Sequence, residues 1–242
     1  MNGLLEVRGV SKSFRGLKAV QDASFTIPEG SINALIGPNG AGKTTIFNMV
    51  AGVFAPDSGK IEFLGKQIQG LRPDQVCAAG IGRTFQIVKP FAGLTVLDNV
   101  VVGALLRSKD VSAAKSYAAE IMEKLGLGAK RDLPASSLTL PDRKRLEVAR
   151  ALATRPKLLL LDEVMAGLNP TECDLMVEVF RNLNKTSGLT ILLIEHVMRA
   201  VMALAQHVGV LHHGEVIARG TPAEIVRDPA VLECYLGEET EV

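Results

Sequence analysis

A glycine-rich segment at residues 37–45 combines the residue types and the spacing that bind the phosphates of a nucleotide. It matches the pattern GxxxxGK[ST], and it lies after a short apolar run and before a helix-like run, as that pattern requires. Backbone N–H groups and the helix N-terminus can surround phosphates, Lys43 can reach the β and γ phosphates, and the Thr44 hydroxyl can bind Mg²⁺. The predicted nucleotide site comprises Gly37, Pro38, Asn39, Gly40, Ala41, Gly42, Lys43, Thr44 and Thr45.

Two further apolar runs end in side chains that could act on a bound phosphate. Leucines at 158–161 precede Asp162 and Glu163, and the run at 189–194 is followed within two residues by His196. Ligands of open α/β sheets bind at the carboxyl ends of strands. We predict that Asp162 holds Mg²⁺ directly or through water, that Glu163 is the general base for the attacking water, and that His196 reaches the γ phosphate. Each motif alone also fits a solvated acid or a histidine at a helix start.

The elements that must position these side chains form an α/β core. Residues 31–36, 158–161 and 189–194 are short continuous apolar runs, which is typical of buried parallel strands. A helix is expected at 45–51, directly after the glycine-rich segment. The predicted fold class is therefore α/β, a nucleotide-binding domain whose mixed sheet carries the site at one edge.

Other strand patterns predict a small antiparallel sheet and a hairpin. Residues 4–10 and 20–27 alternate in hydrophobicity between turn residues, and 60–63 is expected to add a third strand to them. Residues 208–211 and 215–219 flank a His-His-Gly turn, which predicts a hairpin at the end of the main sheet.

The middle of the chain has helical rather than strand spacing. Residues 111–125 carry apolar side chains at helical intervals on one side. We therefore predict one domain over 1–242, in which a helical subdomain at 85–155 is inserted between the two parts of the core, 1–84 and 156–242.

Composition excludes several classes of protein. Lys and Arg number 27 against 26 Asp and Glu, a net charge of +1, and aromatic residues make up 4%, so a nucleic-acid-binding chain is not indicated. Three distant cysteines fit neither a disulfide framework nor a zinc site. Residues 1–10 lack the pattern of a secretory signal, so we expect a cytosolic chain. The most apolar stretch, 189–211, contains charged residues and is not expected to span a membrane.

Taken together, these segments resemble the ATP-binding subunits of ABC transporters over nearly the whole chain. Gln86, in the run GRTFQ, matches the Q-loop, which implies contacts with Mg²⁺ and the attacking water and coupling to membrane subunits. Phe14, 23 residues before Gly37, matches the aromatic residue that stacks on adenine, although a core position fits it equally. His196 matches the switch histidine. The D-loop is matched by Ala166, Gly167, Leu168 and Asn169, with Asn169 where Asp is usual.

The family's LSGGQ signature, which binds the γ phosphate held by the opposite subunit, is degenerate in this chain. Pro141 has no N–H to donate, and Asp142 brings negative charge towards a phosphate, although both residues favour the start of a helix. We predict a weak signature; the alternative is a helix-capping loop that has drifted. Both interpretations imply a dimer with two unequal ATP sites. The segment comprises Leu138, Thr139, Leu140, Pro141 and Asp142.

Longer runs are similar to the LivG type of subunit, which serves importers of branched-chain amino acids and related solutes. They include DEVMAGLNPTE at 162–172, IEHVMRAVM at 194–202, GTPAEI at 220–225 and the tail YLGE at 235–238. The resemblance implies ATP and Mg²⁺ as cofactors and a peripheral position on the cytoplasmic face of the membrane. It implies integral membrane permease subunits and a second ABC ATPase subunit as partners, in a heterodimer or a homodimer, and a periplasmic or extracellular solute-binding protein as an indirect one. No nucleic-acid partner is implied.

Three other functions remain open at this point: a soluble ABC ATPase acting on DNA or ribosomes, the ATPase of lipopolysaccharide export, and an idle regulatory subunit. A single cassette and near-neutral charge argue against the first, and intact Glu163 and His196 argue against the last. For the membrane partner we predict an apolar coupling surface at 88–97, formed by Val88, Phe91, Leu94 and Val96, although some of these residues could pack inside the insertion.

Overall fold

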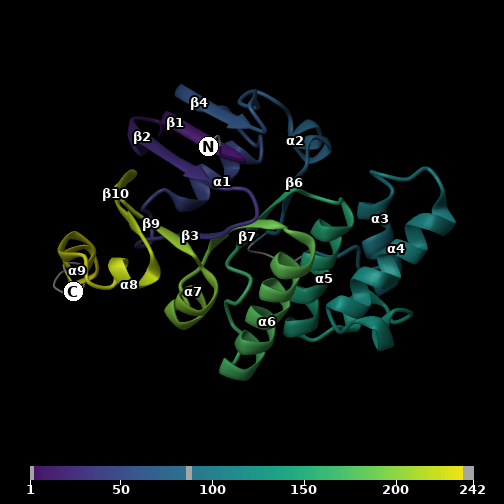
Figure 1. Cartoon of the computed structure of the whole chain (residues 1–242). Coiled ribbons are helices and arrows are strands. Elements are labelled where there is room, and N and C mark those ends of the chain that lie inside the picture. Colours follow the sequence, from purple (N-terminus) through teal and green to yellow (C-terminus); the bar gives the residue numbers. More distant parts are fainter. Residues whose placement is uncertain (1–2, 86–88, 237–242) are drawn as a thin grey trace.

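Two β-sheets and the helices packed on them make up the chain, in a computed structural model that describes residues 3–85 and 89–236 (Figure 1). The larger sheet has six strands in the described residues. Strands β9, β3, β8, β7 and β6 run parallel, and β10 is antiparallel at one edge. In spatial order they are β10 (Glu215–Gly220), β9 (His207–His212), β3 (Ile32–Ile36), β8 (Thr190–Ile194), β7 (Leu158–Asp162) and β6 (Ile81–Arg83).

The central strands are buried on both faces, as their continuous apolar runs predict. Successive side chains point to opposite faces, so Leu159 and Leu161 join the core on the helical side, whereas Leu158 and Leu160 join the core beneath the second sheet. The strand predictions at 31–36, 158–161 and 189–194 are thus confirmed, as is the hairpin formed by β9 and β10.

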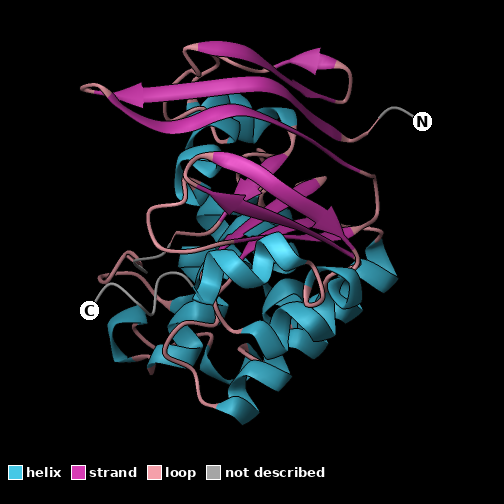
Figure 2. Ribbon diagram, turned by 90° about the vertical axis from the view of Figure 1, so that its left-hand side faces the viewer, coloured by secondary structure: helices cyan, strands magenta, loops and turns pink. Residues whose placement is uncertain are grey.

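The second sheet is antiparallel and lies over the first, with helix α1 (Lys43–Val50) packed between them (Figure 2). Its order is β2 (Leu17–Ile27), β1 (Leu5–Phe14), β4 (Ser58–Phe63) and β5 (Lys66–Gln67). The three predicted strands are confirmed, but β1 and β2 extend further towards their connecting turn than the alternation of apolar residues indicates.

Helices cover the opposite face of the six-stranded sheet and extend to one side of it (Figure 1). The predicted helix at 111–125 is confirmed as α4, with Ala114, Ala118, Ile121 and Met122 buried. No helix among residues 3–85 and 89–236 is both long and apolar enough to cross a membrane. Helix α2 (Pro73–Ala79) instead packs beneath the second sheet through Val76. The other helices after α1 are α3 (Val96–Ala104), α4 (Val111–Lys124), α5 (Leu140–Ala153), α6 (Pro170–Ser187), α7 (Met198–Leu204), α8 (Pro222–Ile225) and α9 (Pro229–Leu236).

Arg107, which follows α3, ties the helical segment to the core. Its guanidinium donates to the carbonyls of Cys77 and Ala78 at 3.2 and 2.9 Å, and to the carbonyl of Thr154 at 2.9 Å. These carbonyls belong to the last turns of α2 and α5, where helix dipoles favour a cation. One side chain therefore fixes the end of α5 against the edge of the core. The division into a core and a helical subdomain at 85–155 stays a prediction.

Candidate active site

The register of the parallel strands brings the predicted site residues to one edge of the sheet. Ile194 at the end of β8 pairs with Leu35 of β3 on one side and with Asp162 of β7 on the other. The segments that follow these three strands therefore start side by side. They carry the phosphate loop, Glu163 and His196, as the strand-end argument predicts.

The phosphate loop joins β3 directly to α1. The buried Lys43 turns back over the loop, and its Nζ donates to the carbonyls of Gly37 at 2.6 Å and Pro38 at 2.7 Å. The first turn of α1 contains no acidic residue, so no carboxylate there opposes the binding of an anion at the positive end of the helix dipole. The helix begins at Lys43, two residues before the predicted start at Thr45. Lys43 and Thr44 therefore belong to its first turn.

Two glycines allow the loop to press against its neighbours. Gly42 has a φ of 102°, and a Cβ there would lie 2.3 Å from the Ala19 carbonyl oxygen. Gly37 has a φ of 142°, and a Cβ there would lie 2.0 Å from the Leu211 carbonyl oxygen. Any side chain at either position would meet backbone atoms of β2 or β9. The glycines of the motif thus permit both the loop conformation and its close packing.

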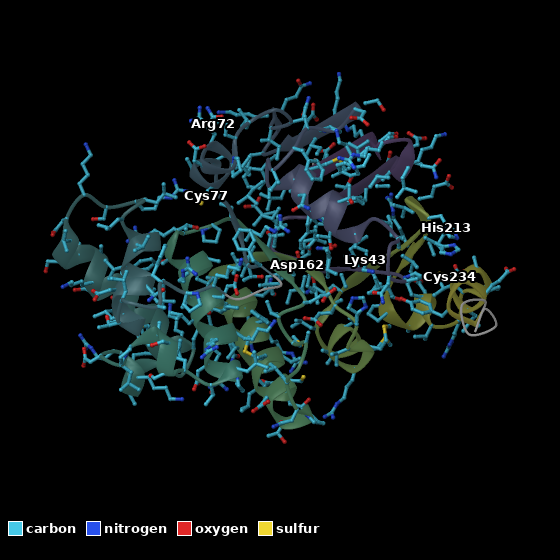
Figure 3. The ribbon with its side chains drawn as sticks, turned by 180° about the vertical axis from the view of Figure 1, so that it is seen from behind. Lys43, Arg72, Cys77, Asp162, His213 and Cys234 are labelled. Atoms are coloured by element: carbon cyan, nitrogen blue, oxygen red, sulfur yellow. The ribbon has the colours of Figure 1, made fainter. Side chains whose placement is uncertain are left out.

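A cavity of about 550 Å³ lies beside the loop. In Figure 3 Lys43 lies between Asp162 and His213 in the middle of the molecule. His213, in the turn of the β9–β10 hairpin, lines this cavity, although the sequence pattern marks it only as a turn residue. The remaining lining residues are Leu17, Lys18, Ala19, Gln21, Asn39, Gly40, Ala41, Gly42, Lys43, Thr44, Thr45 and Glu163.

Phe14, the predicted adenine-stacking residue, lies at the end of β1 and is 42% exposed, so it is not a core side chain. Its ring meets the edge of Phe54 at a centroid distance of 5.2 Å, and the Lys12 ammonium lies 5.6 Å from the ring centroid. Adenine stacking by Phe14 stays a prediction.

Asp162 is held in a buried ion pair at the end of β7. It is 2% exposed, and its Oδ2 accepts from Nη2 of Arg83 at 2.9 Å. Burial raises the pKa of Asp162 above its usual value, and the hydrogen bond and charge of Arg83 oppose that rise without cancelling it. The second oxygen, Oδ1, is buried without a hydrogen-bond partner.

The donor set around Asp162 fits Mg²⁺. A buried carboxylate oxygen without a donor is costly unless a cation or water meets it. Asp162 and Thr44 line one hollow of about 500 Å³, together with the acid Glu147 and the cations Arg83, Lys89 and Arg150. A carboxylate and a hydroxyl therefore border the same space. Mg²⁺ prefers such oxygen ligands and keeps several waters.

Glu163 and His196 form the contact expected of a base and its partner. His196 Nε2 lies 2.7 Å from Glu163 Oε1. Glu163 has a left-handed φ of 49°, and its amide donates to the carbonyl of Ile194 at 2.9 Å. The buried Lys144 of α5 donates to the Glu163 carbonyl at 3.1 Å. Backbone and side chain of Glu163 are therefore both fixed by segments distant in sequence.

Glu195 has a separate role from His196. It is 2% exposed, and its Oε1 accepts from the amide of Met165 at 2.9 Å, directly before the predicted D-loop. Burial raises the pKa of Glu195 to about 6. Of the D-loop residues, Ala166, Gly167 and Asn169 are exposed and Leu168 is half-buried. Asn169 caps α6 by accepting a hydrogen bond from the amide of Glu172 at 2.9 Å. This residue therefore stabilises the start of the helix.

The degenerate signature starts α5, as Pro141 and an acid predict. Asp142 does not, however, offer a bare charge: its buried carboxylate is paired with Lys130, accepts from the Thr139 hydroxyl at 2.8 Å, and lies 3.8 Å from Arg145. Burial opposes ionisation, but the Lys130 and Thr139 hydrogen bonds and the two cations outweigh it and lower the pKa of Asp142. The expected repulsion of a phosphate is thus reduced by neighbours that the motif does not contain.

Gln86, the predicted Q-loop residue, lies outside the described residues, but both flanks of its segment are anchored by α5. Glu147 accepts from the amide of Phe85 at 2.6 Å, and Arg150 donates to the carbonyl of Lys89 at 3.1 Å. The signature helix therefore holds the chain on each side of Gln86. No pattern close to these residues in the sequence predicts either hydrogen bond.

Glu147 should make the stability of the fold depend on pH. Burial raises its pKa from 4.5 to about 6, so the folded chain keeps a proton that the unfolded chain releases between these values. The stabilising contribution of Glu147 is therefore greatest below pH 4.5 and is lost as pH rises through 6, by about 2 kcal/mol. Glu147→Gln keeps an oxygen acceptor for Phe85 and does not titrate. Relative to the unchanged chain, the variant should gain about 2 kcal/mol between pH 4.5 and pH 7 in urea unfolding.

Glu120→Gln, at an exposed position on α4, is the matched control, and its stability difference should vary by less than about 0.5 kcal/mol over the same range. A pH-independent difference for Glu147→Gln would contradict the assignment.

The predicted coupling surface is only partly confirmed as an exposed face. Phe91 and Leu94 are 45% and 38% exposed, but Val96 is fully buried because it starts α3 and packs inside the helical layer. Val88 lies outside the described residues. Contact of this surface with a membrane subunit stays a prediction.

Comparison with known proteins covers the chain almost from end to end. Residues 20–166 match a model of ABC transporters, and residues 215–241 match a model described as a branched-chain amino acid ATP-binding cassette transporter. The chain is 40% identical over 250 residues to the high-affinity branched-chain amino acid transport ATP-binding protein LivG of Salmonella typhimurium, which covers 97% of this chain and 98% of that one.

Two further relatives extend the comparison. The lipopolysaccharide export system ATP-binding protein LptB of Escherichia coli is 37% identical over 237 residues, covering 97% of this chain and 98% of that one. The crystal structure of an ATP-binding cassette of an ABC transporter in its ADP conformation is 30% identical, with a TM-score of 0.88 over 98% of this chain and 100% of that one. Similarity in sequence and in fold thus runs over the same whole length.

Proposed function

The chain belongs to the ABC transporter family of ATP-binding proteins, and from this we propose that it is the ATP-hydrolysing subunit of an importer for branched-chain amino acids or related small solutes. The observation that carries the proposal is the pairing of Glu163 with His196 at the sheet edge that also holds Lys43 and Asp162. The match of residues 215–241 to the branched-chain model supports this solute class over lipopolysaccharide export.

The residues of the site divide the work of binding and hydrolysis. Lys43 exchanges the loop carbonyls of Gly37 and Pro38 for phosphate oxygens, and the amides at the start of α1 hold the remaining phosphate charge. Thr44 and Asp162 would hold Mg²⁺, which when bound neutralises charge on the β and γ phosphates.

Glu163 accepts a proton from the attacking water, and its contact with His196 fixes the direction of the carboxylate. His196 is 43% exposed in its side chain, so it can also meet the γ phosphate as that group approaches Glu163. Gln86 completes this shell in the proposal, from the segment that α5 anchors on both sides.

In the working complex the chain would dimerise with a second ABC ATPase and dock beneath integral membrane permease subunits on the cytoplasmic face. The solute-binding protein outside the membrane would act on this chain only through the permeases. A different ATPase partner would supply its signature to the site of Lys43 and Glu163, while the segment 138–142 of this chain faces the partner's nucleotide.

Recovery of this chain from detergent-solubilised native membranes tests the proposed function. We expect two integral membrane proteins and a second ATPase with an intact signature to be recovered with it. In vesicles reconstituted from that complex, ATP should drive uptake of radiolabelled leucine through the matching binding protein. Recovery with ribosomes, nucleic acid or lipopolysaccharide-export components would overturn the proposal.

Restoring the signature should raise the ATPase rate of that complex. Pro141→Gly with Asp142→Gln returns a backbone N–H and removes the carboxylate, so the partner's γ phosphate gains donors. We expect the rate to rise by about tenfold, which is the effect that one recovered hydrogen bond to a charged group can have. Lys130→Gln, which leaves the N–H groups unchanged and removes the cation beside Asp142, should not raise the rate. An unchanged rate in a folded double variant would favour a drifted capping loop.

A further inference from the structure

Arg83 is a partly buried cation at the end of β6 that touches three parts of the site. Its side chain is 9% exposed. Nη2 donates to Asp162 Oδ2 at 2.9 Å, and Nη1 donates to Oδ1 of Asn48 in α1 at 2.6 Å. The guanidinium also lies 5.3 Å from the centroid of the Phe85 ring. One side chain thus connects the phosphate-loop helix, the predicted metal carboxylate and the segment that leads to residue 86.

These contacts leave Arg83 little freedom. Burying a guanidinium is costly unless its N–H groups are paired; Asn48 and Asp162 hold the two terminal nitrogens, and Nε is buried without a hydrogen-bond partner. Because Asn48 draws Nη1 towards α1, the guanidinium engages Asp162 through Oδ2 and leaves Oδ1 without a partner. The carboxylate therefore has one oxygen fixed by protein and one buried oxygen without a hydrogen-bond partner.

We propose that Arg83 is the positioning residue for Asp162: it occupies Oδ2 and so orients Oδ1 to accept Mg²⁺ in the hollow shared with Thr44. The inference rests on the proposed function, which supplies the metal. A fixed ligand binds metal more tightly than one that must be ordered, and loss of such supporting partners typically weakens metal binding by about 10- to 100-fold. In this role Arg83 acts on the metal through the Asp162 carboxylate.

The opposing possibility is that Arg83 stands where the cation binds and competes with it. A competing guanidinium would cover the available oxygen, whereas Oδ1 is the atom that Arg83 leaves without a partner. The two possibilities predict opposite signs: removal of a positioning residue weakens metal binding, and removal of a competitor strengthens it.

The test measures Mn²⁺ binding to the purified full chain by electron paramagnetic resonance in the presence of ATP, together with binding of a fluorescent ATP analogue in EDTA. Arg83→Met should weaken Mn²⁺ binding by about 10-fold or more, while analogue binding in EDTA stays within about twofold. Arg83→Lys keeps the charge but cannot reach Asn48 and Asp162 together, so it should lie between. Arg72→Met, which removes an exposed arginine paired with Asp74, should leave both unchanged.

A double variant separates positioning from a general loss of structure. With Asp162→Asn already present, Arg83→Met should add no more than about a twofold further loss, since its partner carboxylate is gone. Tighter Mn²⁺ binding by Arg83→Met, or an equal loss in both backgrounds, would overturn the inference. If Arg83→Met does not fold, Arg83→Lys and its double variant decide the matter by the same criteria. A wild-type chain without metal-dependent ATP binding would instead refute the proposed function.

Discussion

Glu163→Gln should lower kcat for ATP hydrolysis by about 10²- to 10⁴-fold and leave ATP binding almost unchanged. The amide preserves the shape of the side chain and an oxygen within reach of His196 Nε2, which lies 2.7 Å from Oε1 in the native chain. It cannot accept the proton of the attacking water. The loss should therefore appear in kcat and not in the affinity for nucleotide, measured by phosphate release from the reconstituted complex and by equilibrium binding.

Glu120→Gln makes the same chemical change on the exposed face of α4 and should leave both measurements unchanged. The variant should also accumulate the ATP-bound dimer, seen as a larger species in size-exclusion chromatography with ATP. Turnover within a few-fold of wild type would contradict the role of Glu163 as the base. Either another residue would then be the base, or this subunit would be catalytically idle.

Lys43→Met should weaken ATP binding by about 10- to 100-fold, because hydrogen bonds to charged groups contribute about 1.5–3 kcal/mol each. The structure adds an effect on the protein itself. Nζ of the buried Lys43 satisfies the carbonyls of Gly37 and Pro38, so its removal also leaves two loop acceptors unpaired in the nucleotide-free chain. We expect a lower Tm in addition to the weaker binding, measured by calorimetry and by titration of a fluorescent ATP analogue.

Lys60→Met, on the exposed part of β4, controls for the loss of one positive charge. Its Tm and its affinity for nucleotide should match those of the unchanged chain. Native affinity in Lys43→Met would contradict the assignment of the phosphate loop. If the Tm were lower while the affinity stayed native, Lys43 would stabilise the loop without binding the nucleotide.

The strands of the site were predictable because burial on both faces requires continuous apolar runs, and β3, β7 and β8 contain little else. Strand β6 was not, since Ile-Gly-Arg is too short to show a period and pairs with β7, which is distant in the sequence. Helix α2 was also missed: it buries only Val76, so no apolar stripe marks it.

The same distinction separates the site residues. Lys43 and Glu163 lie in contiguous motifs whose spacing alone indicates their chemistry. Arg83 and Glu195 act through partners 79 and 30 residues away, so no local pattern could show that they hold Asp162 and Met165. Asp142 was identified but its surroundings were not, because Lys130 comes from a separate 3₁₀ turn, Gly128–Lys130, outside the signature.

The pairing of Lys130 with Asp142 constrains how this sequence can change during evolution. An acid at 142 in the absence of a cation at 130 or 145 would be buried with no opposite charge beside it, and a lone lysine at 130 would lose its partner. Substitutions at these positions should therefore occur together among relatives. Relatives with a glutamine at 142 should not require a lysine at 130. Residue 130 should therefore vary with the residue at 142.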